Sequence, residues 1–374
     1  MHPPIDLSTL SVAVARVLDL KAPAALRTMA ARGVAPGLKP HDALTVVALM
    51  AQDDADPLVE VARATLDAIP ERLLDAALVA DLPAGVLAVV APKFAKNTAV
   101  MLKILALPQL ETSTVAALAA RASEAVAELI AINEERMLAD STIIEQLYLN
   151  KATRMSTCDR IIEFAVRSGK ELTGIAAFHE VAAAIAGELI AEPSDEPGFD
   201  DVLFVEAEAI ATEVEAGVSN DETHVIDEET GEEKLVEKLK PVKLKLTDMN
   251  VSQKVRRAML GTPSERAILV RDNNKIVAAA AIKSPMIQEN EVVRIAGSRN
   301  VSEDVLSVIV RSREWMRTYQ VKLNLVQNPR VPFTQVAKLI PLLRESDLKT
   351  LAGSKNVSGA VSLAARQHLQ RKTK

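Results

Sequence analysis

Apolar residues recur at helical spacing along most of the chain, at positions i, i+3, i+4 and i+7. One clear stretch with this spacing contains Val115, Leu118, Ala119 and Ala122. Prolines interrupt the pattern at short intervals, and the first half contains Pro40, Pro57, Pro70, Pro83, Pro92 and Pro108. Because proline is tolerated in the first turn of a helix but disrupts its interior, the pattern predicts consecutive short helices from about Ser8 to Ile190 and again from about Asp248.

Two segments, 97–166 and 274–344, resemble copies of one pattern. At a constant shift of 177 positions, Asn97, Val100, Pro108, Val115 and Ala119 recur as Asn274, Val277, Pro285, Val292 and Ala296. After a two-residue insertion near Ser298–Val301, the residues Ser123, Glu124, Val126, Glu135 and Met137 recur as Ser302, Glu303, Val305, Glu314 and Met316. Self-similarity over a long window indicates stacked supersecondary units.

The composition favours helices that pack through small side chains. Apolar residues make up 49% of the chain but aromatic residues only 2%, and the 13 glycines are too few for the regular turns of an all-β protein. Pro108 follows Pro70 by 38 residues, and Pro329 follows Pro285 by 44. These intervals are close to the units of about 40–47 residues found in HEAT and armadillo repeats. We therefore expect an all-α fold, an α-solenoid of HEAT- or armadillo-like repeats in two halves.

Charge is sorted along the chain. The formal net charge is −6 for 1–190, −14 for 191–240 and +14 for 241–374, which gives −6 in total. Such sorting is informative about domains and partners. It predicts an N-terminal helical-repeat domain at 1–190, an acidic and partly disordered linker at 191–240, and a basic C-terminal helical-repeat domain at 241–374.

Parts of the acidic segment have local structural signals of their own. The segment as a whole is polar and rich in turn residues, so it cannot bury enough apolar surface to order fully. A short hairpin is expected within Thr223–Leu235, around Thr230-Gly231. One helical face is also expected, formed by Leu203, Ala207, Ile210 and Val214.

Several helix ends are predicted in the C-terminal half. Ser252 is expected to cap a helix at Gln253–Leu260, which Gly261 closes. The next helices are expected to open at Ser264, Ser302 and Ser358.

Two resemblances to known repeats follow. The stretch from Asp53 to Val59, an Asp-rich turn followed by Pro57 and then by valine and alanine, resembles the second helix of a HEAT repeat, although Glu60 stands where that pattern usually carries arginine. Residues 250–372 contain VSQKVRRAMLGTPSERAILVRDNNKIVAAAAIKSP, EVVRIAGSRNVSEDVLSVIVRSREW and LAGSKNVSGAV. This part resembles an uncharacterised family of bacterial HEAT-like/armadillo-like helical-repeat proteins. The resemblance implies a HEAT-like α-solenoid and implies no activity.

Motifs for catalysis and cofactor binding are missing from the sequence. It contains neither GxxxxGK[ST] nor GxGxxG nor HExxH, and its five histidines are scattered. The single cysteine, Cys158, lies between Arg154 and Arg160, which would favour a reactive thiol. It also aligns with the apolar Val336 of the second copy, which favours a buried structural thiol. We expect the buried thiol, no cofactor and no enzymatic activity.

The expected compartment is the cytoplasm. A single cysteine allows no disulfide within the chain and suits a reducing environment. The N-terminal residues lack the features of a secretory signal. No window of about 18 apolar residues suggests insertion into a membrane.

Basic residues in the C-terminal half are the best candidates for a binding site. One cation per repeat unit would form a stripe, and a basic stripe attracts phosphates. The candidates are Lys254, Arg256, Arg257, Arg271, Lys275, Arg294, Arg299, Arg311, Arg313, Arg317, Lys322 and Arg330.

The sequence is compatible with two functions. The first is a non-enzymatic scaffold that binds another protein or peptide on the surface of its stacked helices. The second is nucleic-acid binding by 241–374, modulated by the acidic linker, although few aromatic residues are present to stack on bases.

Overall fold

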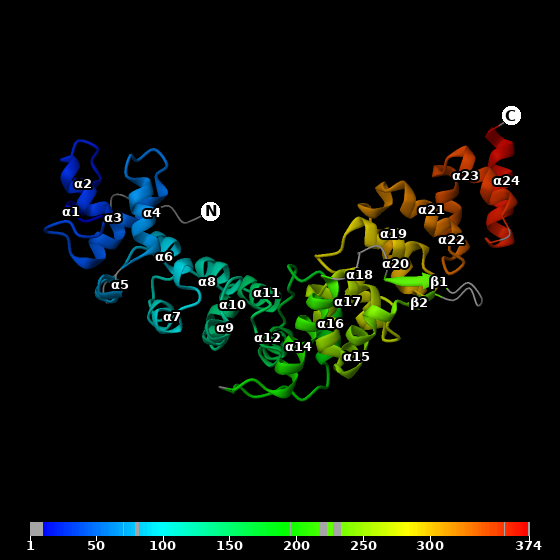
Figure 1. The fold of residues 1–374 in the computed structure, drawn as a ribbon, viewed down its shortest axis with the longest axis horizontal. Helices are drawn as coiled ribbons and strands as arrows, with labels where there is room; N and C mark the ends of the chain where they lie inside the picture. Colours follow the sequence, from blue (N-terminus) through cyan, green and yellow to red (C-terminus); the bar gives the residue numbers. More distant parts are fainter. Residues whose placement is uncertain are drawn as a thin grey trace. The chain divides into compact units, whose positions relative to one another are not determined.

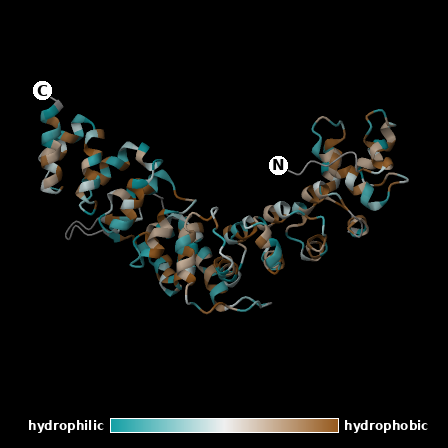
Figure 2. Ribbon diagram, turned by 180° about the vertical axis from the view of Figure 1, so that it is seen from behind, coloured by the Kyte–Doolittle hydropathy of each residue, from teal (hydrophilic) through white to brown (hydrophobic). Residues whose placement is uncertain are grey.

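The computed structural model describes residues 10–69, 71–78, 82–194, 196–216, 223–226, 233–354 and 356–372. Within these ranges the chain forms 24 α-helices, four short 3-10 helices and one two-stranded hairpin (Figure 1). The predicted all-α fold class is confirmed. Most helices carry both hydrophobic and hydrophilic residues (Figure 2), as the periodic pattern predicted.

The chain divides into two compact units, unit 1 (Met1–Gly174) and unit 2 (Ile175–Lys374). The helices of unit 1 are α1 (Val12–Leu18), α2 (Ala24–Ala31), α3 (Pro40–Gln52), α4 (Val59–Asp67), α5 (Glu71–Ala77), α6 (Ala84–Val90), η2 (Ala91–Phe94), α7 (Thr98–Leu105), α8 (Thr112–Ala119), α9 (Glu124–Ala131), α10 (Glu134–Ala139), α11 (Thr142–Leu149) and α12 (Met155–Arg167).

Unit 2 contains the hairpin and the remaining helices. These are α13 (Phe178–Ile185), α14 (Phe199–Glu215), β1 (His224–Ile226), β2 (Glu233–Leu235), η3 (Glu237–Leu239), α15 (Lys240–Asp248), α16 (Val251–Leu260), α17 (Pro263–Leu269), α18 (Lys275–Ile282), α19 (Glu289–Gly297), α20 (Glu303–Arg311), η4 (Trp315–Arg317), α21 (Tyr319–Gln327), α22 (Phe333–Leu339), η5 (Ile340–Leu342), α23 (Glu345–Gly353) and α24 (Gly359–Lys372).

Packing within each unit is local. In unit 2, α16 packs against α18 and α18 against α20, while α17 packs against α19 and α19 against α21. In unit 1, α7 contacts α9, and α8 contacts α11. Fully buried alanines, such as Ala62 and Ala119 in unit 1 and Ala280 and Ala296 in unit 2, allow the short helices to approach closely. The small-residue composition therefore acts through close contacts between neighbouring helices.

Side-chain hydrogen bonds join successive helix pairs at a regular step. The amide of Asn150 donates to the carbonyls of Ala119 and Ala122, and the amide of Asn328 donates to those of Ala296 and Ser298. The sequence separations in these four bonds are 28–32 residues. This step is shorter than the predicted units of about 40–47 residues. Proline intervals gave the longer value because not every proline begins an equivalent helix.

Positions paired by the proposed duplication have matching local roles. Asn97 caps α7 by accepting a hydrogen bond from Val100 N–H, and Asn274 caps α18 by accepting one from Ile276 N–H. Cys158 and Val336, also paired, have exposed fractions of 0% and 1%. The expected burial of the cysteine is thus confirmed.

Two predicted helix starts were wrong by two residues. Helix α16 is capped by Asn250, whose side chain accepts from Gln253 N–H, while Ser252 lies buried within the helix. Helix α17 is capped by Thr262 and has Pro263 in its first position, so Ser264 lies inside it. In both cases a polar residue three positions before a Gln or Glu completes a capping box, a signal that outweighs a lone serine. The predicted cap at Ser302 and the helix end at Gly261 are confirmed.

The acidic segment contributes a packed helix. In α14, Leu203 and Ala207 are buried as predicted, and the helix contacts α15 and α17. The predicted hairpin is present as β1 paired antiparallel with β2. Its expected turn at Thr230-Gly231 lies outside the described residues. The compact units and the predicted domains are different divisions of the chain, and the domain limits at 190 and 240 stay predictions.

Candidate partner-binding site

Two of the predicted surface cations lie in the core of unit 2. Arg256 and Arg257 on α16 are both 0% exposed. Their guanidinium groups lie over the ring of Phe204 from α14, at 4.8 and 5.0 Å from its centroid. Arg257 also donates two hydrogen bonds, of 2.7 and 2.5 Å, to the Glu265 carboxylate. Because a buried charge must be paired, these arginines hold α14, α16 and α17 together and offer no surface to a ligand.

A second buried pair lies beside the first. Arg266 donates hydrogen bonds of 3.0 and 2.8 Å to the Glu291 carboxylate and one of 2.6 Å to the Gly261 carbonyl. Sequence reasoning missed this charged core. The available signal was the capping box Thr262-Pro263-Ser264-Glu265, which fixes Glu265 at a helix start close to the preceding helix.

The other predicted cations fall into three groups. Lys254 and Arg271 line one pocket, together with Asp272. Lys275 on α18 pairs with Asp304 at 2.9 Å, and the pKa of Lys275 is raised first by the hydrogen bond to Asp304 and then by its negative charge. The remaining residues lie on the described surface between α19 and α22, where they are exposed or half-buried: Arg294, Arg299, Arg311, Arg313, Arg317, Lys322 and Arg330.

Arg299 and Arg330 occupy corresponding turns. Four turns of unit 2 join the first helix of a pair to the second, at 270–274, 298–302, 328–332 and 354–358, and we call them the turn edge. In each of them a side-chain oxygen accepts a hydrogen bond from the N–H two residues later. The accepting residues are Asp272, Ser298, Asn328 and Ser354. The same kind of hydrogen bond therefore occurs in the neighbouring turns that carry Arg299 and Arg330.

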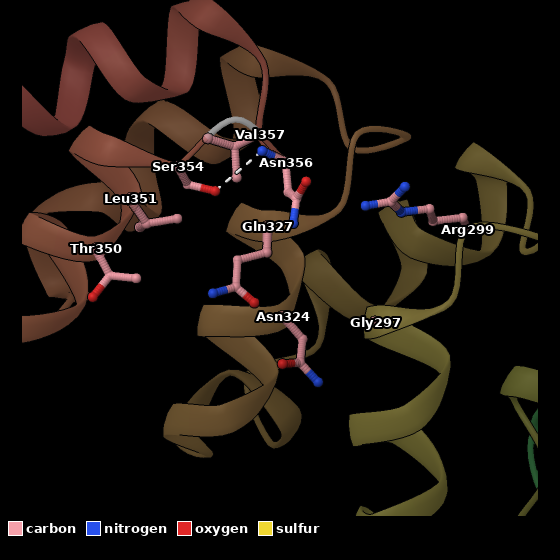
Figure 3. Close-up of a pocket in the computed structure, with 9 residues that line it drawn as sticks. All are labelled: Gly297, Arg299, Asn324, Gln327, Thr350, Leu351, Ser354, Asn356 and Val357. Carbon is pink, nitrogen blue, oxygen red and sulfur yellow. Dashed lines mark hydrogen bonds between the residues drawn. The ribbon is translucent and has the colours of Figure 1, made fainter. Parts of the chain in front are cut away.

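The Arg299 pocket has a volume of about 480 Å³ and lies between α19, α21 and α23. Figure 3 shows the Arg299 side chain extending toward the space beside Gln327 and Asn356. All three side chains are exposed, and Arg299 makes no ion pair with a described residue. Asn324 also lines the pocket, but its amide already donates to the Val293 carbonyl. The free polar groups are therefore one guanidinium and two amides.

The Arg330 pocket, of about 420 Å³, is lined mainly by the turn 328–332. Gln327 lines both pockets, so the two are adjacent. Phe333, which is 44% exposed, supplies an apolar contact, and Glu303 supplies one carboxylate. Arg330 has no ion-pair partner among the described residues. The two pockets together offer hydrogen-bond donors and acceptors, two cations and one aromatic ring.

Sequence reasoning named Arg299 and Arg330 but missed Gln327 and Asn356. The signal for Asn356 is a repeated string, GSRNVS at 297–302 and GSKNVS at 353–358. Such a recurrence at the start of two helices indicates equivalent turns. Gln327 has no comparable signal because only tertiary packing places it between two pockets.

The chemistry of these pockets is suited to binding. Among the described residues, histidine, cysteine, aspartate and glutamate side chains form no group of three that could hold a metal ion. Over the same ranges, no helix is both long and apolar enough to cross a membrane. The groups present can form hydrogen bonds and ion pairs with a ligand.

Comparisons with known proteins leave the family open. No protein-family model matches the chain, and neither the curated proteins nor the solved structures contain a detectable relative. The resemblance of 250–372 to a bacterial helical-repeat family thus stays a prediction.

Proposed function

We propose that the protein is a non-enzymatic scaffold, an α-solenoid of short HEAT- or armadillo-like units, that binds an extended acidic segment of another protein at the turn edge of unit 2. The local packing of α16 to α21 and the hydrogen-bond step of 28–32 residues support the solenoid. The observation that carries the binding function is the pair of adjacent pockets that share Gln327, each with an exposed arginine that has no described carboxylate partner.

The chemistry of the two pockets suits a peptide. Side-chain amides both donate and accept hydrogen bonds, so Gln327 and Asn356 can pair with a peptide backbone. Guanidinium groups bind carboxylates in a bidentate fork, which gives Arg299 and Arg330 a preference for Asp or Glu side chains. Phe333 adds apolar contact area at the end of the surface. An extended chain with two acidic residues would satisfy these groups together.

Nucleic-acid binding by 241–374 is the competing function. It is favoured by Arg311, Arg313 and Arg317, which are exposed and have no described carboxylate partner. The aromatic residues offer it little. The ring of Tyr319 is covered by the Arg344 guanidinium at 4.4 Å from its centroid, so that face is not free to stack on a base.

One binding experiment separates the two functions. We would measure fluorescence anisotropy of a labelled Glu-Ser repeat peptide, and of labelled single-stranded and duplex DNA, with the full-length protein at low salt. The test variant is Arg299→Ala/Arg330→Ala, and the matched control is Arg311→Ala/Arg313→Ala, which removes the same charge outside the pockets. The pocket variant should bind the peptide at least about tenfold more weakly, because it loses two charge-assisted contacts. The control should change the affinity by less than about twofold.

The opposite results would reject the proposal. Absence of peptide binding, or equal weakening by both variants, would remove the turn edge as a specific site. DNA binding that weakens equally in both variants would favour the nucleic-acid function, because phosphate contacts depend on the number of cations more than on their pocket.

A further inference from the structure

Helix α14 has an apolar surface on the side that faces away from its packing partners. Leu203 and Ala207 lie on the buried side, where the helix contacts α15 and α17. Phe199, Val202 and Val205 are also large apolar residues, but they are 79%, 44% and 64% exposed. Exposed apolar side chains that lie together and are bordered by polar ones are typical of a surface that a partner covers.

The exposed face of α14 changes from apolar to acidic along the helix. Residues three and four positions apart lie on one helix face, and Phe199 and Val202 are followed at this spacing by Glu206, Ala209 and Glu213, all of them exposed. This face is about 20 Å long at a rise of about 1.5 Å per residue. We call it the α14 stripe, and it consists of Phe199, Val202, Val205, Glu206, Ala209 and Glu213.

The negative charge of α14 is only partly balanced. The helix contains six acidic residues and no Lys or Arg. Lys245 pairs with Glu206 at 2.7 Å, and Arg257 pairs with Glu208 at 3.3 Å. Glu213 has no cationic partner among the described residues, and the adjoining segments 217–222 and 227–232 contain neither Lys nor Arg. Because Glu213 also lies in the last turn, where the helix dipole disfavours negative charge, a cation supplied by a partner would be favourable there.

We propose that the α14 stripe binds a basic amphipathic helix of another protein, with apolar side chains against Phe199 and Val202 and Lys or Arg side chains beside Glu206 and Glu213. An amphipathic helix covers such a surface with its apolar face. A second copy of α14 fits poorly. In a parallel pair its carboxylates would face these carboxylates, and in an antiparallel pair they would face the apolar end. Charge complementarity thus favours the basic partner.

The test is fluorescence anisotropy of labelled model peptides with the full-length protein at about 0.15 M salt, where attraction between exposed charges is screened beyond about 8 Å. The main peptide is a Leu-Lys helix with leucines at alternating intervals of three and four residues and lysines elsewhere. It should bind saturably. Two comparison peptides replace every leucine by serine or every lysine by glutamate. Each should bind at least about tenfold more weakly, because the first loses the apolar contact and the second meets like charge.

Two variants locate the binding on the stripe. Phe199→Ser removes its most exposed apolar side chain, and Glu213→Lys reverses its unpaired carboxylate. Each should weaken binding of the Leu-Lys peptide at least about fivefold. The matched controls are Leu189→Ser and Glu192→Lys, because both residues are exposed and precede α14 by a short distance in the sequence. The controls should change the affinity by less than about twofold.

Four results would overturn the proposal. The first three are no saturable binding of the Leu-Lys peptide, equal binding of the serine-substituted peptide, and equal weakening by Glu213→Lys and Glu192→Lys. The fourth is self-association of the wild type in sedimentation velocity that Phe199→Ser abolishes, which would assign the stripe to a second copy. Circular dichroism of each variant checks that the helices are retained.

The α14 stripe is separate from the proposed scaffold site. It shares no residue with the lining of the Arg299 pocket or the Arg330 pocket. Arg299→Ala/Arg330→Ala should therefore leave binding of the Leu-Lys peptide within about twofold of the wild type. Failure of the acidic peptide to bind would reject the turn edge, and failure of the Leu-Lys peptide to bind would reject the stripe.

Discussion

Unit 1 and unit 2 both bury arginine side chains, but they surround them differently. In the described part of unit 1, Arg27 on α2 pairs with Asp56 at 2.5 Å, and it is the one arginine among the buried residues of that unit. In unit 2, Arg256, Arg257 and Arg266 lie together with glutamates from neighbouring helices. The Arg27–Asp56 pair joins α2 to the turn before α4. The arginine cluster of unit 2 connects α14, α16, α17 and α19.

The cluster in unit 2 also explains the role of the acidic helix α14. Besides its pairing with Glu265, Arg257 has Nη1 3.3 Å from the Glu208 carboxylate of α14, and the ring of Phe204 from the same helix covers both α16 arginines. Part of the negative charge that the sequence concentrates in 191–240 thus balances positive charge inside unit 2. The comparison shows that charge sorting along a chain can serve packing as well as partner recognition.

The largest expected effect comes from breaking each buried pair. Glu265→Ala leaves Arg257 buried with its main partner missing, and Asp56→Ala does the same to Arg27. Each should lower the free energy of unfolding of its unit by about 3–5 kcal/mol. The single tryptophan, Trp315, lies in unit 2 and the single cysteine, Cys158, in unit 1, so urea unfolding followed by fluorescence and by thiol reactivity reads each unit separately.

Each substitution should affect the unfolding curve of its own unit only. Glu265→Ala should shift the fluorescence-detected unfolding curve to lower urea concentration, and Asp56→Ala should shift the curve detected by thiol reactivity in the same direction. As a control, Asp304→Ala breaks an exposed pair with Lys275 and should cost less than about 1 kcal/mol. If both reporters moved together in both variants, the two units would unfold as one and the comparison between them would fail.

A smaller effect is expected from the two asparagines that link helix pairs. Asn328 is 4% exposed, and Asn328→Ala should cost about 2 kcal/mol because it removes two bonds to helix carbonyls and one from Arg330 N–H. Asn150 makes the same kinds of bond but is half-buried, so water can replace part of them. Asn150→Ala should cost about 1 kcal/mol. The same two reporters measure both variants, and a larger loss at Asn150 would contradict the burial argument.

The smallest effect concerns alkaline pH. Partial desolvation, and next the hydrogen bond donated to Asp347, raise the pKa of Tyr319 above its usual value of 10.0. A raised phenol pKa stabilises the protonated folded state, so this contribution is complete below the unfolded pKa and is lost as pH rises through the folded value. The unfolding midpoint of wild type should therefore fall more than that of Tyr319→Phe between neutral and strongly alkaline pH. Parallel curves for the two proteins would show that the Tyr319–Asp347 bond carries no such coupling.

Helix content, the cap at Ser302 and the buried cysteine could be predicted from the sequence. Periodic small aliphatic residues specify helices locally, and Ser302 identifies a cap because capping depends on residues a few positions apart. The helix face at Leu203 and Ala207 follows from the same short-range rule.

Tertiary packing decided which charges are buried and which are exposed. Arg256 and Arg299 look alike as sequence positions, but the ring of Phe204, distant in the chain, encloses the first, while the second lies in an open turn. The step of 28–32 residues between helix pairs and the position of Gln327 between two pockets arise in the same way. Burial and electrostatic pairing depend on which helices meet in space, and a periodic pattern within each helix leaves that choice open.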